Sequence, residues 1–178
     1  MVKKEVQKER FKYAISSAIK VIAEDPKLEI SFGNKFQAEK NVLNLPGLNK
    51  LANKQDYTNI RAHADSEALK IKYTDNKVYI KNQPDGKIAK TLYAIAEKIR
   101  YEKIGSEKLK GIKNNIINCY ENRLKSREDD EISSIQNEAV AEAFELYLRS
   151  YFFKIKETSQ TKKILKDWKN TFEKNLKK

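Results

Sequence analysis

The sequence has few of the residues that build disulfide-linked, zinc-bound or turn-rich proteins. Its 178 residues include one Cys, one His, five Gly and three Pro. One cysteine cannot form an internal disulfide, and one Cys with one His cannot supply the four ligands of a structural zinc site. So few glycines and prolines argue against a many-stranded sandwich or barrel, which needs many tight turns. The composition leaves an oxygen-ligand Mg²⁺ site open.

Long apolar runs are also missing. No run approaches the roughly 20 residues that span a bilayer, and the charged residues 1–10 lack the apolar core of a secretory signal. Together with the single cysteine, these absences predict a protein of the reducing cytoplasm without a membrane partner. The length favours one domain over residues 1–178.

The lone cysteine and the lone histidine do not form a recognisable catalytic pair. Cys119 lies in the apolar run 116–120, which predicts a buried, inert thiol. His63 lies among small and charged residues, so we expect it at the surface or in a second layer. No nucleophile motif surrounds either residue.

The net charge is strongly positive and unevenly spread. The chain has 37 Lys and Arg against 25 Asp and Glu, which gives +12, and residues 146–178 alone carry ten basic and three acidic side chains. Such a balance can indicate binding to nucleic-acid phosphates. Only six of the 37 basic residues are Arg, however, although base and phosphate recognition favour Arg. We therefore expect a solvated lysine-rich surface, with a basic helical nucleic-acid-binding module as the alternative.

The first third of the chain predicts one helix and one small hairpin. Residues 3–24 carry apolar side chains at three- and four-residue steps, which predicts an amphipathic helix that ends before Asp25-Pro26. Residues 28–32 then alternate between apolar and polar, a turn follows at Gly33-Asn34, and residues 41–45 form a second short run. These two runs predict a β-hairpin, the single piece of β structure in the chain.

The middle of the chain is ambiguous between helix and strand. Residues 57–73 fit a helix, whereas residues 69–73 followed by 77–80 also fit a hairpin, and we favour the helix. After a turn at 84–86, a helix is predicted to end at Gly105 as a left-handed cap, with Ser106 capping the next helix.

The C-terminal third predicts two more helices. Asp129-Asp130 suits the N-terminus of a helix with a wide apolar face that reaches Phe153. A last helix spans 164–176, and its stripe around Trp168 is expected to be core, with a docking face for another chain as the alternative. The predicted fold is mainly α, a single helical domain with one small β-hairpin.

Common catalytic motifs are absent from the sequence. A P-loop needs four residues between its glycines and then Lys, but five residues separate Gly105 from Gly111 and Ile112 follows. The metal-binding D-x-S-x-S motif, the serine nucleophile elbow and H-E-x-x-H are also missing. Glu97 and Glu102 are five apart on one predicted helix, so they point in different directions. We predict no catalytic, cofactor-binding or metal-ligating residue, and no catalysis by this chain alone.

Four polar residues stand among apolar helical surface. Arg61 and Asp65 are spaced i, i+4, and Arg100 and Glu102 flank Tyr101. They predict ion pairs that lock helices together, or a recognition patch for a partner protein.

Several segments, in order, resemble the N-terminal domain of the T subunit of the aerobic, ATP-dependent cobalt chelatase (the CobT family). The resemblance covers residues 11–124 and is carried by these segments: residues 11–23 with 28–33 (LEISFG, for the family's L-E-V-x-F-G-like strand); residues 61–75 (RAHADSEALKIKYTD, for R-G-x-A-D-x-x-A-L-R-L-R-x-H-D); residues 97–105 (EKIRYEKIG, for E-Q-A-R-x-E-x-x-G); and residues 111–116 (GIKNNI, for G-x-x-x-N-[LI]). Three positions depart from the family pattern, with Ala62 for Gly, Thr74 for His and Lys98 for Gln.

The resemblance implies a role in a three-component machine. In that family a large subunit binds the corrin and cobalt, an AAA+ subunit hydrolyses ATP, and the T subunit assembles with the AAA+ ring. Together they insert Co²⁺ into hydrogenobyrinic acid a,c-diamide during cobalamin synthesis. The resemblance therefore implies a non-catalytic adaptor whose complex uses Co²⁺, Mg²⁺ and ATP, while this chain binds no cofactor. The family's C-terminal von Willebrand A domain is not found in these 178 residues.

The resemblance also directs attention to the four polar residues. The matched segments contain Arg61, Asp65, Arg100 and Glu102, which become the candidates for binding the AAA+ partner. The expected partners are the AAA+ subunit and the large corrin-binding subunit, with a homo-oligomer also possible.

Overall fold

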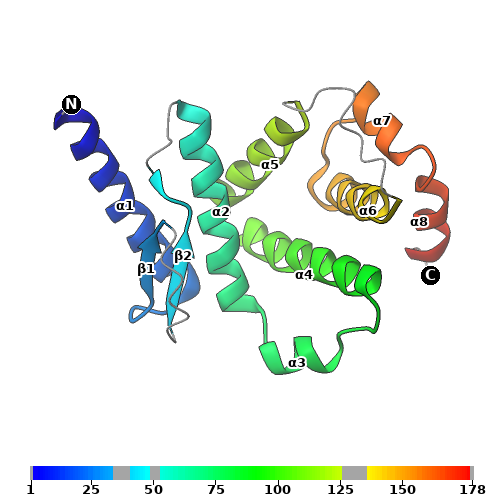
Figure 1. Cartoon of the computed structure of the whole chain (residues 1–178), viewed down its shortest axis with the longest axis horizontal. Coiled ribbons are helices and arrows are strands. Elements are labelled where there is room, and N and C mark those ends of the chain that lie inside the picture. Colours follow the sequence, from blue (N-terminus) through cyan, green and yellow to red (C-terminus); the bar gives the residue numbers. More distant parts are fainter. Residues whose placement is uncertain (1, 34–40, 49–52, 126–135, 177–178) are drawn as a thin grey trace.

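The computed structural model describes residues 2–33, 41–48, 53–125 and 136–176 (Figure 1). These residues form eight helices and two short strands, so the predicted mainly helical fold is confirmed. In chain order the elements are α1 (Val2–Ala23), β1 (Glu29–Phe32), β2 (Val42–Leu45), α2 (Lys54–Tyr73), α3 (Asn76–Lys81), α4 (Lys87–Lys108), α5 (Lys110–Lys125), α6 (Gln136–Phe153), α7 (Ser159–Leu165) and α8 (Lys169–Leu176).

Helix α2 lies in the middle of the molecule. It packs against α1 and β2 on one side and against α4 and α5 on the other (Figure 1). Helix α4 in turn packs against α6, which carries α7 and α8 at the far side of the molecule. Helices α2 and α4 therefore connect the N-terminal elements to the C-terminal helices. None of the helices in the described ranges is both long and apolar enough to cross a membrane.

The two predicted strands do pair, but the predicted hairpin is wrong. β1 and β2 run parallel, with Glu29 opposite Val42 and Phe32 opposite Leu45. A tight turn joins antiparallel strands only, because the chain between parallel strands must travel back along their length. The alternating pattern indicated two half-buried strands correctly, but it contains no information on their relative direction. Asn34 of the predicted turn lies outside the described residues.

The ambiguous middle segment is helical. Asn53 caps α2 by accepting from the backbone N–H of Asp56, whose side chain accepts in return from the backbone of Asn53. The residues that could have formed a second strand instead form the short helix α3, which Asp75 caps through two backbone N–H groups. The predicted helix ending near Tyr73 is thereby confirmed.

The predicted helix end at Gly105 is wrong. Helix α4 continues through Lys108, so Gly105 and Ser106 are both buried inside it, and Ser106 caps nothing. The break comes at Leu109, whose extended backbone separates α4 from α5. Gly105 instead packs against Leu69 of α2. A Cβ at this position would lie 2.6 Å from Leu69 Cδ1 and closer still to Cδ2, so a larger residue would collide. The glycine thus allows α2 and α4 to approach closely.

The C-terminal segment differs from the prediction by one break. Two short helices, α7 and α8, replace the single predicted helix, and Thr158 caps α7 by accepting from the backbone of Thr161. The predicted apolar helix up to Phe153 is present as α6, which packs against α4, α7 and α8. The Asp129-Asp130 pair that was expected to start it lies outside the described residues.

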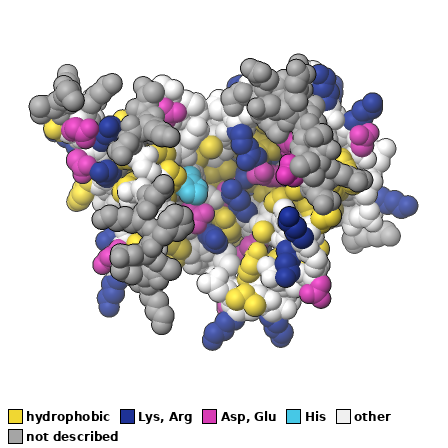
Figure 2. Space-filling view, in the orientation of Figure 1, with side chains coloured by type: hydrophobic (Ala, Val, Ile, Leu, Met, Phe, Trp, Pro, Cys, Tyr) yellow, Lys and Arg dark blue, Asp and Glu magenta, His cyan; other side chains and the backbone are white. Residues whose placement is uncertain are grey.

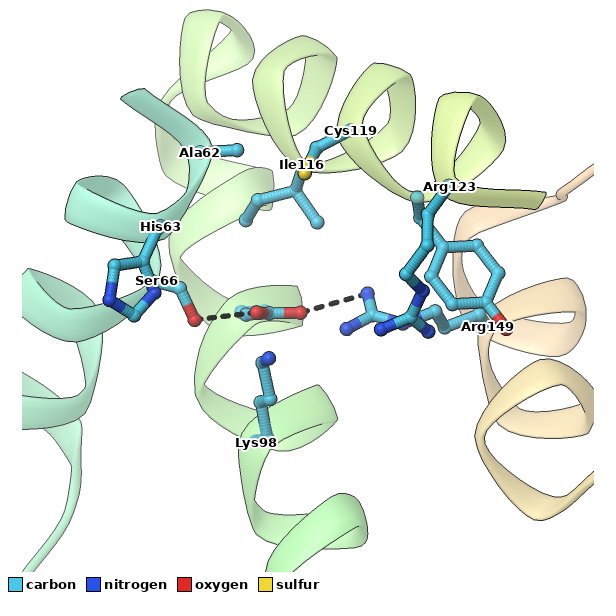
Figure 3. A pocket seen from close by; sticks show the side chains of 10 residues that line it. Ala62, His63, Ser66, Lys98, Ile116, Cys119, Arg123 and Arg149 are labelled. Carbon is cyan, nitrogen blue, oxygen red and sulfur yellow. Dashed lines mark hydrogen bonds and ion pairs between the residues drawn. The ribbon is translucent and has the colours of Figure 1, made fainter. Parts of the chain in front are cut away.

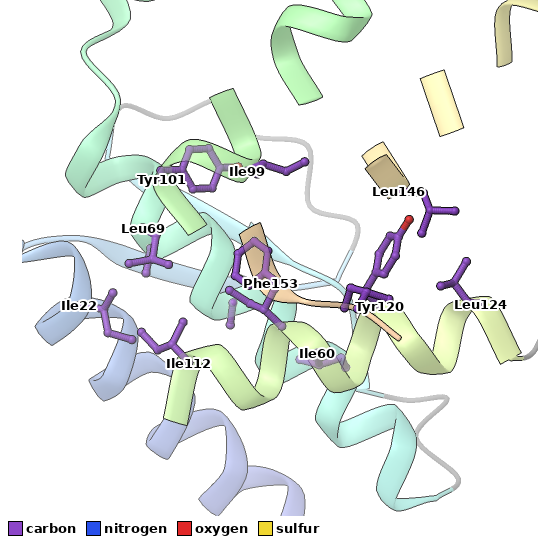
Figure 4. Packing of buried hydrophobic residues seen from close by; sticks show 14 of the residues in the cluster. Ile22, Ile60, Leu69, Ile99, Tyr101, Ile112, Tyr120, Leu124, Leu146 and Phe153 are labelled. Atoms are coloured by element: carbon purple, nitrogen blue, oxygen red, sulfur yellow. The ribbon is translucent and has the colours of Figure 1, made fainter. Parts of the chain in front are cut away.

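A continuous apolar core joins the helices, and Figure 4 shows its central part. α1 buries Ile15 and Ile19, and α2 buries Leu69. On the other side of α2, Ile99 of α4 and Leu146 of α6 are almost fully enclosed. The ring of Trp168 stacks on Phe172 of α8 and packs against this core, which confirms the core assignment for the Trp168 stripe.

We expect Gly105→Ala to destabilise the fold by about 1–3 kcal/mol, the usual cost of overpacking a close contact. The added methyl group would collide with Leu69, which is itself enclosed in the core. Gly111→Ala is the matched control, because a Cβ there meets no heavy atom of the described residues within 4 Å. Urea unfolding of both variants measures the difference. Equal stability of the two variants would contradict the close helix approach.

Candidate functional site

A buried carboxylate joins three helices. Ser66 of α2 donates its hydroxyl to Glu102 Oε1 of α4 at 2.6 Å. Arg149 of α6 places Nη1 2.9 Å from Glu102 Oε2. The side chains of Glu102 and Arg149 are only 2% and 4% exposed. The ion pair therefore lies inside the protein, where Figure 3 shows it between α2 and α6.

The network continues from Arg149 to a second carboxylate. Arg149 Nε donates to Glu145 Oε1 at 2.8 Å, and Arg123 Nη2 of α5 donates to Glu145 Oε2 at 2.8 Å. Burial alone would raise the pKa of Glu145, but the two guanidinium groups outweigh it and hold that pKa below its ordinary value. Burial works against the charge of Arg149, and the two carboxylates overcome it and raise the pKa of the guanidinium. Both groups therefore stay charged.

An aromatic ring lies close to both arginines. The guanidinium carbon of Arg123 is 4.6 Å from the ring centre of Tyr120, and that of Arg149 is 4.7 Å from it. Both distances suit cation–π contacts. Burial raises the pKa of the Tyr120 phenol to about 12, so the ring stays neutral.

The predicted Arg61–Asp65 pair exists on α2. Arg61 Nη2 lies 2.9 Å from Asp65 Oδ1, and Asn115 of α5 donates to Asp65 Oδ2 at 2.8 Å. Burial nevertheless raises the pKa of Asp65, against the opposing effects of Asn115 and Arg61. This carboxylate holds α5 against α2.

Arg100 binds the C-terminal end of α2. Its Nε donates to Glu97 Oε2 at 2.6 Å, and its Nη2 donates to the backbone carbonyl of Tyr73. Thr74 donates its hydroxyl to the other oxygen of Glu97 at 2.7 Å. The hydrogen bond from Arg100 is the main reason that the pKa of Glu97 falls below its ordinary value. A cation at the last carbonyls of a helix also suits the helix dipole.

The four candidates therefore lie in three places and make no single patch. Arg61 and Asp65 contact each other, Glu102 belongs to the Arg149 network, and Arg100 lies with Glu97. Asp65 and Glu102 are buried, whereas Arg61 and Arg100 are partly exposed. Each has a partner within the chain, and binding to an external partner stays a prediction.

A cavity of about 120 Å³ opens beside the network (Figure 3). Its walls come from α2, α4, α5 and α6, and they consist of Ala62, His63, Ser66, Lys98, Glu102, Ile116, Cys119, Tyr120, Arg123 and Arg149. His63 and Lys98 also line a larger groove of about 480 Å³ between α2, α3 and α4. His63 is exposed, as predicted, and the histidine appears in cyan near the middle of the face in Figure 2.

The environment of Cys119 differs in part from the prediction. The thiol is half-buried, because its side chain forms part of the cavity wall rather than the core. Burial still raises its pKa above the ordinary value. The thiol therefore stays protonated, which agrees with the predicted lack of reactivity.

Sequence reasoning missed three members of the network, Arg123, Glu145 and Arg149. One signal was available, because Glu145 and Arg149 are spaced i, i+4 within the apolar stretch 139–153. An opposite-charge pair inside so apolar a run indicates a buried ion pair. The partner on α4 could not be read from the sequence, because Glu102 lies 47 positions before Arg149 and meets it only in the folded structure.

The described residues contain no group of three or more His, Cys, Asp or Glu side chains that could hold a metal ion. Glu102, Glu145, Arg123 and Arg149 instead pair with one another, within α6 and across helices. What this arrangement can do by itself is fix the relative positions of α2, α4, α5 and α6.

Comparison with known protein families identifies one match. Residues 5–178 match the model of the family described as cobalamin biosynthesis protein CobT, which covers nearly the whole chain. The match extends the resemblance of residues 11–124 through α6, α7 and α8. No solved structure matches the chain significantly.

We expect Arg149→Met to cost about 3–5 kcal/mol of unfolding free energy, because it leaves a buried carboxylate without its cation. The double variant Glu102→Gln with Arg149→Met removes both charges and should recover part of that loss. Lys103→Met is the control, since Lys103 pairs with Glu107 at the surface. Urea unfolding of the two single variants, Glu102→Gln and Arg149→Met, and of the double variant gives the coupling energy. Additive effects of the Glu102 and Arg149 changes would contradict the ion pair.

We expect Arg100→Ala to lower the unfolding free energy by only about 1 kcal/mol, because its charged hydrogen bonds are partly exposed to water. The variant separates the two interpretations of this residue. A lower melting temperature with unchanged partner binding indicates a brace for α2. An unchanged melting temperature with lost partner binding indicates recognition.

Proposed function

Because the chain belongs to the CobT family of cobalamin biosynthesis proteins, we propose that it is a non-catalytic assembly domain of an ATP-dependent cobalt chelatase. In this proposal the complex inserts Co²⁺ into hydrogenobyrinic acid a,c-diamide in the cytoplasm. ATP, Mg²⁺ and the corrin are bound by the other subunits, and this chain contacts the AAA+ subunit. The family match over residues 5–178 is the observation that carries the proposal.

The buried network supports an assembly role. The ion pairs of Arg149 with Glu102 and Glu145 hold the helices in fixed positions. A rigid domain of this kind suits a protein that presents its surface to partners. Pairing of this kind fixes helix positions and leaves the outer faces of the helices available. The proposal therefore places partner contacts on the outside of the domain.

One exposed apolar surface lies on α3 and at the start of α4. Helix α3 buries none of its residues, and its Val78 and Ile80 are 55% and 70% exposed. Ile88 follows as an exposed residue at the start of α4. Exposed apolar side chains that form a patch are typical of protein interaction sites. In Figure 1 these elements form an outer corner of the molecule, and we propose that the AAA+ subunit binds there.

One of the four polar candidates lies beside this surface, and a second is exposed elsewhere on α2. Arg100 binds the end of α2 directly before α3, and its side chain is partly exposed. Arg61 lies on α2 and is also partly exposed. In the proposal these two exposed arginines contact the partner, while Asp65 and Glu102 are buried and hold the helices together.

We expect the chain to co-purify with the AAA+ chelatase subunit of the same organism at physiological salt, with ATP present or absent. Replacing Val78 and Ile80 together by Ser should abolish the complex without lowering the melting temperature, because neither side chain is buried. Val21→Ser is the control, since Val21 is an even more exposed apolar residue, on the distant α1.

No complex in either nucleotide state would contradict the assembly role of these residues. Duplex DNA or RNA binding that weakens steeply with added salt would then favour the basic nucleic-acid-binding module. A complex that survives the Val78 and Ile80 changes would move the interface away from α3.

A further inference from the structure

Positive side chains from three helices meet at the cavity beside the buried network. Lys98 comes from α4, Arg123 from α5 and Arg149 from α6, and all three line the cavity. Figure 3 shows the three side chains directed toward one space, with His63 on its far side. Glu102 is the single carboxylate in the lining.

The cations at the cavity differ in whether a carboxylate of the described residues pairs with them. Glu102 and Glu145 together neutralise Arg149 and Arg123. Lys98 is half-buried, and among the described residues it has no carboxylate within ion-pair distance. Lys98 thus presents its ammonium group at the wall of a partly enclosed space, where the attraction to an anion is stronger than in bulk water.

The same three cations surround the thiol of Cys119. Burial has the largest effect and raises the pKa of this thiol, as does Glu102, whereas Arg123, Lys98 and Arg149 each act to lower it. All three cations therefore act on one point in the cavity wall.

The size and donors of the cavity restrict what it can hold. A water molecule occupies about 30 Å³ in the liquid, so about 120 Å³ accommodates roughly four waters or a group of four to five heavy atoms. Arg149 has five N–H donors, of which Nε and Nη1 contact carboxylates. Its Nη2 donors and the Lys98 ammonium can therefore serve an added acceptor.

We propose that this cavity binds a small oxyanion, a phosphate or a carboxylate group, with Lys98 as its principal charge partner. Arg123 and Arg149 add positive potential from the opposite wall, and His63 lies at the entrance from the α2–α3–α4 groove. The site is separate from the proposed chelatase assembly role, because it needs only the isolated chain.

The single histidine makes this site unusually easy to observe. Because the chain has one His, the ring Cε1–H of His63 gives one unambiguous NMR signal next to Lys98. We expect sodium phosphate, added at constant pH and ionic strength against sodium chloride, to shift this signal along a saturable curve. Sodium acetate in a parallel titration tells whether the site prefers a tetrahedral or a planar anion.

Lys98→Met should weaken the oxyanion affinity about tenfold or more, the size expected for a lost charged hydrogen bond. Lys98→Arg should restore most of it, and Lys87→Met, an exposed control on the same helix, should leave it unchanged. Saturation by either anion with this variant pattern supports the site. A shift that is linear in salt, a response to neither anion, or equal affinity in Lys98→Met and Lys87→Met overturns it.

Discussion

The buried charge of Glu102 determines how α2, α4, α5 and α6 are positioned relative to one another. A carboxylate that is 2% exposed is costly unless a cation and hydrogen-bond donors meet it. Arg149 provides the cation, but a buried guanidinium carries the same cost, and Glu145 meets it. Glu145 in turn binds Arg123, which brings in α5. One buried charge thereby couples the positions of four helices.

Helices α2 and α4 also approach each other closely at Gly105. Glu102 and Gly105 are three residues apart on α4, and Ser66 and Leu69 are three apart on α2, so each pair shares one helix face. The Ser66–Glu102 hydrogen bond and the Leu69–Gly105 packing are therefore consecutive contacts of one interface. The short hydrogen bond requires close helices, and the glycine permits them. The Ser66–Glu102 hydrogen bond and the Leu69–Gly105 contact therefore depend on the same close approach of α2 and α4.

Most of the helices could be predicted from the sequence, but few of the contacts between them could. Periodic apolar residues predicted α1, α2 and α6, because burial of one helix face leaves a repeating pattern. The same local reasoning misassigned Gly105, since a glycine near the end of an apolar stripe looks identical whether it caps a helix or admits a neighbour. The strand direction and the Glu102–Arg149 pair depend on contacts between distant segments, which periodicity does not record. The Arg61–Asp65 pair was predictable because it lies within one helix.

The two kinds of basic residue serve different purposes in this protein. Arg61, Arg100, Arg123 and Arg149, four of the six arginines, each pair with a carboxylate of the chain itself. A planar guanidinium with several fixed donors suits such bracing, because it binds a carboxylate and a second acceptor at once. The lysines supply nearly all the remaining positive charge, largely on the surface. The charge of +12 therefore does not argue for nucleic-acid readout, since the side chains best suited to it already hold helices together. Lys98 is the informative exception, because it is the lysine that lies with the bracing arginines at the wall of one cavity.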